Sequence, residues 1–244
     1  MRKTWIIAGA VAGGLLTAAI AGDRWAAGSA ADRLADRLRC AGGLAQRPEV
    51  TVGGMPFLTQ LARGRFDDVR VEAAAVEVGR FHAGVAARAR QVRTAAGSVR
   101  AASLTVEATF RYAELTAPDD VPGRAPGEFG YDGAGRLRLA TTAPVLGREV
   151  PVVVHAAPEL TGPDLVVRPV EVEVPAIGIR IPADRLGDRA RPRVIGLPAL
   201  PAGLAYQGVT ATPDGLRITA GGADIGVPGG RGGEGGRGCG RDAT

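Results

Sequence analysis

Alternating apolar and polar residues dominate the sequence from residue 49 onward. The clearest example is Ala102–Tyr112, where apolar side chains at even positions oppose polar side chains at odd positions. A period of two residues is the signature of a strand that is buried on one face. Similar segments are residues 69–78, 85–93, 136–142, 150–155 and 165–174. Strands that are apolar on one face only predict an antiparallel sheet with one covered and one wet side.

A helical period occurs only near the N-terminus. In residues 27–41 the charged side chains point away from a single apolar stripe, as in an amphipathic helix. Ser29 is expected to be the N-cap of this helix, and Gly42-Gly43 to end it. The stripe consists of Ala27, Ala30, Ala31, Leu34, Leu38 and Ala41.

Turn-forming residues divide the rest of the chain. Pro213-Asp214-Gly215 predicts the turn of a hairpin between residues 209–212 and 216–220. The segment 117–128 contains three prolines and predicts a loop. Residues 228–244 are rich in glycine, a composition typical of a disordered tail.

The N-terminus has the pattern of an export signal or a membrane anchor. Arg2 and Lys3 precede Thr4–Gly22, which carries no charge. Ala19-Ile20-Ala21 would suit signal peptidase, whereas Trp25 stands where an interfacial aromatic would anchor an uncleaved helix. Both forms stay open. In either case we expect the protein to be exported, and to be anchored to the outer face of the cytoplasmic membrane or secreted into the cell envelope.

The charge of the chain gives little support to nucleic-acid binding. The formal net charge is +5, but Arg2 and Lys3 supply +2 and the tail from Arg231 supplies +1. The residues in between therefore carry only +2. The chain has ten aromatic residues, and none interleaves with the arginines of the tail. Both observations argue against a nucleic-acid partner.

No pattern of catalytic or metal-binding residues is found. His82 and His155 are the only histidines, and no cysteine or pair of carboxylates stands at ligand spacing from either. The three serines lie outside any nucleophile elbow, and no phosphate-binding loop occurs beyond the apolar N-terminus. We therefore expect no catalytic residue, no metal, no cofactor and no enzymatic activity.

The two cysteines could pair in an oxidising compartment. Cys40 falls in the predicted helix and Cys239 in the glycine-rich tail. We interpret Cys40 as a small buried hydrophobe and Cys239 as incidental, so the pair is not expected to form a disulfide framework.

One stretch of the sequence carries a family resemblance. Residues 53–71, "GGMPFLTQLARGRFDDVRV", resemble the signature of the LmeA-like phospholipid-binding family of actinobacterial envelope proteins. In that signature a strand enters a short proline turn, and a second strand follows a glycine. The resemblance continues weakly through residues 108–115 and again at 197–227. The matching positions of the signature are Gly54, Pro56, Phe57, Leu58, Thr59, Leu61, Gly64, Val69 and Val71.

The resemblance implies a fold like that of the tubular lipid-binding (TULIP) proteins. This α+β fold has a long, curved antiparallel sheet that wraps on one or two helices and encloses an apolar groove. The corresponding division of the chain is a signal peptide or anchor over residues 1–25, the lipid-binding domain over 26–227 and the disordered tail over 228–244. In this fold Pro56 would begin a short helix that plugs one end of the groove.

The resemblance also implies a function. It indicates a membrane-associated phospholipid-binding or lipid-transfer protein that supports envelope lipid or lipoglycan maintenance, with an anionic phospholipid as partner. The alternative is an anchored scaffold domain of the envelope that encloses no lipid. Small inward side chains at Ala87, Ala89 and Ala102 would favour a cavity over a solid core.

The candidate lipid-binding residues come from two arguments. The plug helix is expected to point Phe57, Leu58 and Leu61 inward, and strand parity suggests the other members of the set. Arg63, Arg65 and Arg70 are the cations nearest the plug, but the sequence does not identify which arginines would meet a headgroup. The residues suggested by strand parity are Leu104, Val106, Phe110, Val170 and Val172.

Overall fold

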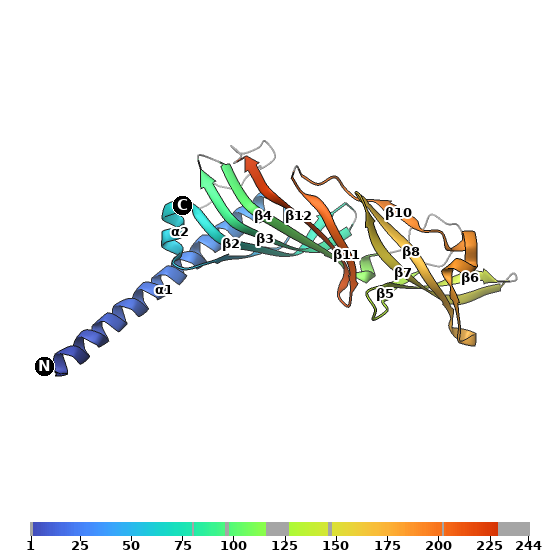
Figure 1. Ribbon diagram of the computed structural model, residues 1–244, viewed down its shortest axis with the longest axis horizontal. Helices are drawn as coiled ribbons and strands as arrows, with labels where there is room; N and C mark the ends of the chain where they lie inside the picture. Colours follow the sequence, from blue (N-terminus) through green and yellow to red (C-terminus); the bar gives the residue numbers. More distant parts are fainter. Residues whose placement is uncertain are drawn as a thin grey trace. The chain divides into compact units, whose positions relative to one another are not determined.

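A 40-residue helix precedes all the strands in the computed structural model (Figure 1). The structure describes residues 2–79, 81–95, 98–115, 127–145, 148–201 and 203–228; for residues 2–16, 145, 189, 227 and 228 it describes the backbone only. The helices are α1 (Arg2–Ala41), α2 (Phe57–Arg63), η1 (Tyr112–Glu114), η2 (Pro175–Ile177) and η3 (Ala183–Ala190).

The strands form two six-stranded sheets within the described residues. In the first sheet the order is β1-β2-β3-β4-β12-β11, and in the second it is β10-β8-β7-β6-β5, with β9 also paired to β8. Every pairing whose register is described is antiparallel. The α+β class with curved antiparallel sheets is thereby confirmed. The strands are β1 (Glu49–Gly53), β2 (Arg65–Val78), β3 (Phe81–Ala95), β4 (Ser98–Phe110), β5 (Glu128–Tyr131), β6 (Leu137–Val145), β7 (Arg148–Thr161), β8 (Asp164–Val174), β9 (Ile179–Pro182), β10 (Arg193–Gly196), β11 (Ala205–Thr212) and β12 (Gly215–Pro228).

The chain divides into two compact units. Unit 1 comprises residues 1–73, 86–104 and 223–244, and unit 2 comprises residues 74–85 and 105–222. Strands β2, β3, β4 and β12 each contribute residues to both units. Within unit 1, α1 packs against β1 and α2 (Figure 1).

Small side chains at every fourth position form the buried face of α1. Ala27, Ala31 and Ala35 are buried, and they continue a row that begins at the buried Asp23. A spacing of four residues keeps side chains on one helix face, and alanine lets a neighbouring backbone come close. The stripe predicted from the sequence contains Ala27 and Ala31 but lacks Ala35, and it wrongly contains Ala41, which is exposed.

The start of the predicted helix was wrong, whereas its end was right. Ser29 is not an N-cap, because α1 runs without interruption from Arg2 to Ala41. The glycines do end the helix: the Gly42 N–H donates to the Leu38 carbonyl at 2.9 Å, and Gly43 adopts a positive φ of 61°. Side chains of residues 1–16, which make up most of the uncharged segment, lie outside the described part. Across the residues that the structure describes, no helix has the length and apolarity needed to cross a membrane.

Cys40 does not match its interpretation from the sequence. Its side chain is exposed near the end of α1, and it takes part in a disulfide bond. The expectation of a small buried hydrophobe is therefore wrong. Cys239 lies outside the described residues, as does the rest of the tail beyond Pro228 and most of the predicted loop 117–128.

The parity of the buried apolar side chains changes along β3 and along β12, and each strand contains one residue with a positive φ angle. Gln91 and Asp224 have positive φ angles of 49° and 51°, which is unusual for residues other than glycine. In β3 the buried position changes from Ala83, an odd number, to Val92, an even one. In β12 the buried apolar side chains stand at even positions up to Ala220, and the next one is Ile225. One extra residue explains such a reversal and also bends the strand, which adds curvature to the sheet.

Unit 2 has its own core at the predicted hairpin. The turn joins Thr212 to Gly215, so the predicted β11–β12 hairpin is confirmed. Tyr112 begins η1 instead of ending β4, and its hydroxyl donates to the Thr212 carbonyl at 2.7 Å. Burial raises the pKa of this tyrosine. The fully buried residues of this core are Leu137, Leu165, Ala211 and Leu216.

The close packing of α1 leads to a prediction about Ala35. We expect Ala35→Leu to lower the free energy of unfolding by about 1–3 kcal/mol, because added methylenes in a filled contact force neighbouring groups apart. Urea unfolding followed by circular dichroism would measure the change. Ala41→Leu is the matched control, since the same substitution at an exposed position of the same helix should cost little. Equal losses in the two variants would show that the buried face of α1 tolerates larger side chains.

Candidate functional site

A carboxylate on α1 holds the first turn of α2 in place. The Phe57 N–H donates to Asp23 Oδ2 and the Leu58 N–H to Asp23 Oδ1, each at 2.9 Å. Arg24 Nη2 lies 2.9 Å from Asp23 Oδ2 and also donates to the Gly54 carbonyl at 2.9 Å. The side chain of Asp23 is only 7% exposed. One aspartate thus connects the first helix to a turn that begins 34 residues later.

The two hydrogen bonds to Asp23 supply acceptors for the first N–H groups of α2, which the residues next to the helix cannot supply. Pro56 occupies the N-cap position of α2, and proline has no side-chain oxygen that could accept from the first N–H groups of the helix. Asp23 supplies that oxygen from α1. The N–H groups of Leu58 and Phe57, together with Arg24, lower the pKa of the Asp23 carboxyl group. The carboxylate form is the one that the fold requires.

Gln60 connects the other side of α2 to β1 and β2. Its buried amide accepts from the Asp67 N–H at 2.9 Å and donates to the Gly53 carbonyl at 3.3 Å. Gly54 has a φ of 91°, and a Cβ atom there would lie 2.4 Å from the Gln60 Nε2 atom. Only glycine fits at this position. We call Asp23, Arg24, Gly54 and Gln60 the α2 clamp.

The clamp fixes which side of α2 is buried and which side is exposed. Phe57 is 1% exposed, and its ring centroid lies 6.1 Å from that of Phe66. Leu58 and Leu61 are each 52% exposed. The expectation that all three would point inward is therefore right for Phe57 and wrong for the two leucines. Phe57 and Gln60 share the buried face of this seven-residue helix, and Leu58 and Leu61 lie about 100° further round it.

A group of charged side chains surrounds His155 in unit 2. His155 Nδ1 lies 3.4 Å from Asp132 Oδ2, and its Nε2 lies 3.6 Å from Glu173 Oε2. The Asp132 side chain is almost fully buried and also contacts Arg136, while Arg180 contacts Glu173 at 3.2 Å. Burial by itself would raise the pKa of Asp132, but hydrogen bonds from the Ala134 N–H and from Arg136 outweigh it and lower the pKa.

This group was missed by the sequence analysis, because its members are far apart in the chain. His155 Nε2 makes no hydrogen bond with any residue that the structure describes. His82, the other histidine, pairs with Glu114, whose Oε2 accepts from the His82 N–H at 2.8 Å. Among the described residues no three His, Cys, Asp or Glu side chains are arranged to hold a metal ion.

The model of one protein family matches most of the chain. It is described as LmeA-like phospholipid-binding, and it covers residues 21–221. The chain belongs to the LmeA-like phospholipid-binding family. No curated protein and no solved structure matches the chain.

The family match begins two residues before Asp23 and therefore includes the whole α2 clamp. The recognition made from residues 53–71 is confirmed. The signature residues of the LmeA-like family now have physical roles: Phe57 is the buried anchor, Gly54 allows the close approach of Gln60, and Gly64 ends α2 with a φ of 60°.

The remaining candidate lipid-binding residues belong to both units. Leu104 lies in unit 1, like the α2 residues, whereas Val106 and Phe110 lie in unit 2. All three are half-buried, but so are Ser103, Glu107 and Thr109 at the other parity, so exposure does not distinguish the two faces of β4. Phe110 makes an edge-to-face contact with Phe81, with ring centroids 6.3 Å apart. A lipid-binding role for Leu104, Val106 and Phe110 stays a prediction.

Val170 interrupts the alternation of β8, and its lipid-binding role stays a prediction. Val172 is half-buried and pairs with Val154, but Val170 is 39% exposed. The register passes from Glu171, opposite His155, to Pro169, opposite Ala156, and leaves Val170 without a partner. A residue in such a bulge does not follow the alternation of its strand. Of the small residues expected to face inward, Ala87 and Ala89 are half-buried, whereas Ala102 is exposed.

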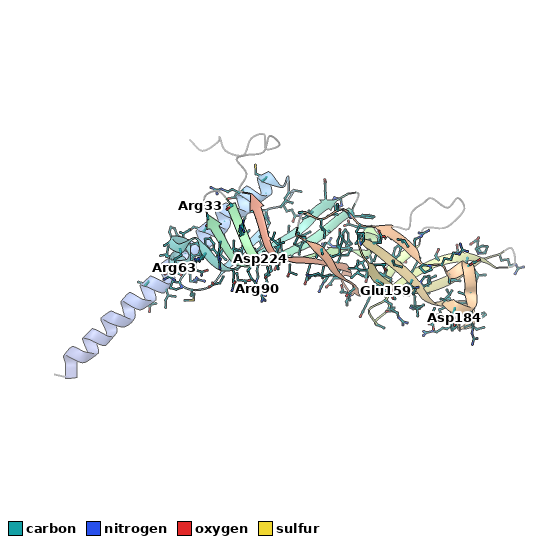
Figure 2. All side chains as sticks on the ribbon, turned by 45° about the horizontal axis from the view of Figure 1, so that its top comes forward. Arg33, Arg63, Arg90, Glu159, Asp184 and Asp224 are labelled. Atoms are coloured by element: carbon teal, nitrogen blue, oxygen red, sulfur yellow. The ribbon has the colours of Figure 1, made fainter. Side chains whose placement is uncertain are left out.

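The three arginines near α2 differ in their surroundings. Arg70 and Arg88 both pair with Asp68, at 2.9 and 2.6 Å, and the hydrogen bond from Arg88 is the main reason why the pKa of Asp68 is lowered. Arg63 and Arg65 are exposed and form no ion pair with any described residue. Figure 2 shows Arg63 at the end of α2. These two are the available headgroup candidates.

The buried carboxylate predicts how stability depends on pH. Because the pKa of Asp23 is lower in the folded chain, its contribution is complete above about pH 4 and is lost as the pH falls further. We expect Asp23→Asn to be less stable than the natural chain at pH 7, since the amide can accept only one of the two N–H groups. The difference should narrow as the pH is lowered below about 4.

Urea unfolding at a series of pH values would measure this difference. Asp32→Asn is the matched control, because it removes the same charge from an exposed position on α1 whose partner Arg47 is also largely exposed. If Asp23→Asn and Asp32→Asn had the same midpoint at pH 7, the clamp would not stabilise the fold.

Proposed function

We propose that the protein is an exported, membrane-associated phospholipid-binding protein that carries or transfers lipid in the cell envelope and supports the maintenance of envelope lipid or lipoglycan. The observation that carries the proposal is the match to a phospholipid-binding family over residues 21–221. The uncharged segment Thr4–Gly22 after two cations supports export and attachment to a membrane.

The sheet offers side chains that suit acyl chains. Ala87 and Ala89 on β3 and Leu104 on β4 are half-buried and small or flexible. An acyl chain that replaces water against such side chains gains about 0.8 kcal/mol for each CH₂ group. Two acyl chains could therefore hold a lipid without any covalent step.

A charged headgroup is expected to stay at the surface, because an unpaired phosphate is costly to bury. Arg63 and Arg65 carry exposed guanidinium groups that form no ion pair with a described residue. Guanidinium groups bind phosphate oxygens through paired hydrogen bonds. These residues support a preference for anionic phospholipids.

Photocrosslinking tests whether lipid is bound by the sheet. The full chain in nonionic micelles would be irradiated with a phospholipid that carries a diazirine in one acyl chain, and the modified peptides would be identified by mass spectrometry. We expect crosslinks at half-buried sheet positions such as Leu104, Val106 and Phe110. Crosslinks confined to residues 1–22 would mean that lipid only surrounds the N-terminal segment, and would leave the scaffold alternative.

A charge on the same face should remove the bound lipid. We expect Val106→Asp to lower the crosslinked fraction of the sheet peptides about tenfold, since burial of a carboxylate against acyl chains costs well above 1.4 kcal/mol. Ile177→Asp is the control, because Ile177 is 65% exposed. An unchanged yield in Val106→Asp would exclude this face as the binding site.

A further inference from the structure

The exposed face of α2 is apolar. Met55 is 60% exposed, Leu58 and Leu61 are each 52% exposed, and Ala62 is also exposed. We call these four residues the α2 apolar face: Leu58, Leu61 and Ala62 follow the three- and four-residue spacing of the helix, and Met55 lies in the turn just before it. A surface helix normally turns its apolar side toward the core. Here the clamp holds Phe57 and Gln60 inside, and the leucines face solvent.

The α2 apolar face lies at the end of the uncharged N-terminal segment. The two hydrogen bonds from the first turn of α2 go to Asp23, the residue directly after Thr4–Gly22. Trp25, two residues further along α1, is 77% exposed. With a rise of 1.5 Å per residue, Trp25 lies about 3 Å further along the helix axis than Asp23. The face and the tryptophan therefore lie at nearly the same level of α1.

Positive charge borders the α2 apolar face. Arg63 ends the helix and Arg65 begins β2, and both are exposed. Neither forms an ion pair with a residue that the structure describes. Short apolar faces flanked by arginines, together with an exposed tryptophan, are typical of segments that lie in the boundary between lipid headgroups and acyl chains.

We propose that the α2 apolar face and Trp25 dock into the surface of an anionic phospholipid bilayer. The proposal rests on the proposed function, because it needs a membrane at the end of Thr4–Gly22. A bilayer is the occupant that fits best, because the apolar segment leads directly to Asp23 and the clamp places α2 there. Leu58 and Leu61 enter the acyl boundary, and Arg63 and Arg65 meet phosphate groups.

Fluorescence quenching by brominated lipid tests the docking. The full chain, with Trp5→Phe and Trp25→Phe, would be reconstituted into vesicles of phosphatidylcholine and phosphatidylglycerol with brominated acyl chains. We expect a tryptophan introduced by Leu61→Trp to be quenched severalfold more than one introduced by Val99→Trp, an exposed position on β4 in the same unit. Equal quenching, or none at either position, would overturn the proposal.

A second experiment measures how docking affects the rate of phospholipid uptake. We expect Leu58→Ser with Leu61→Ser to slow phospholipid uptake from these vesicles about tenfold, because each leucine loses apolar area that would be buried in lipid. Uptake of a monomeric short-chain phospholipid should not change. Val194→Ser with Ile195→Ser is the control, since both residues are exposed on β10 of unit 2. If both double variants slowed uptake equally, the face would have no special role.

The outcomes separate docking from lipid binding. Quenching at position 61 in a chain that takes up no phospholipid would contradict the proposed function and support the docking face. Uptake of phospholipid without quenching at position 61 would support the proposed function and contradict the docking face. If the leucine variant instead dissociated an oligomer in detergent, as judged by sedimentation, the α2 apolar face would be a contact between copies of the chain and the docking proposal would be wrong.

Discussion

The two hydrogen bonds that Asp23 accepts from the backbone of α2 determine the arrangement of unit 1. They replace the cap that Pro56 cannot provide, and they fix a short helix that would be marginal alone. Once α2 is held, Phe57 fills the interior beside Phe66 and Gln60 reaches the backbone of both flanking strands. The exposure of Leu58 and Leu61 is a direct result, because a short helix with one face fixed inward must turn the other outward.

The same unit depends on how closely its parts can approach one another. The row of alanines on α1 leaves room for neighbouring backbone, and the change of parity near Gln91 and Asp224 is what one inserted residue in each strand, with the bend that it causes, would produce. Larger side chains on α1 would keep the neighbouring backbone further away, and a flat sheet would lack the bend of its strands. The low aromatic content of the chain is consistent with this mode of packing, in which small side chains provide most of the buried contacts of α1.

The sequence predicted the parts of the fold that follow from local patterns. Strand alternation, the hairpin around Asp214 and the end of α1 before Gly42-Gly43 all depend on neighbouring residues, and the structure confirms them. Alternation is interrupted at Val170 because of a bulge in the partner register, which has no signal in alternation itself. The clamp and the contacts of His155 were missed for another reason: residues such as Asp23 and Phe57, or Asp132 and His155, meet only after folding. The only signal in the sequence for Asp23 was its place as the first charged residue after the uncharged segment.

Asp23 stands directly after the uncharged segment Thr4–Gly22 and at the same time belongs to the folded unit. Here Asp23 is part of the folded domain, so an artificial leader or fusion partner can replace the chain only up to Gly22. A mature form beginning at residue 26 would lack the acceptor for the Phe57 and Leu58 N–H groups. The folded unit therefore requires the chain from Asp23 onward, whatever stands before it.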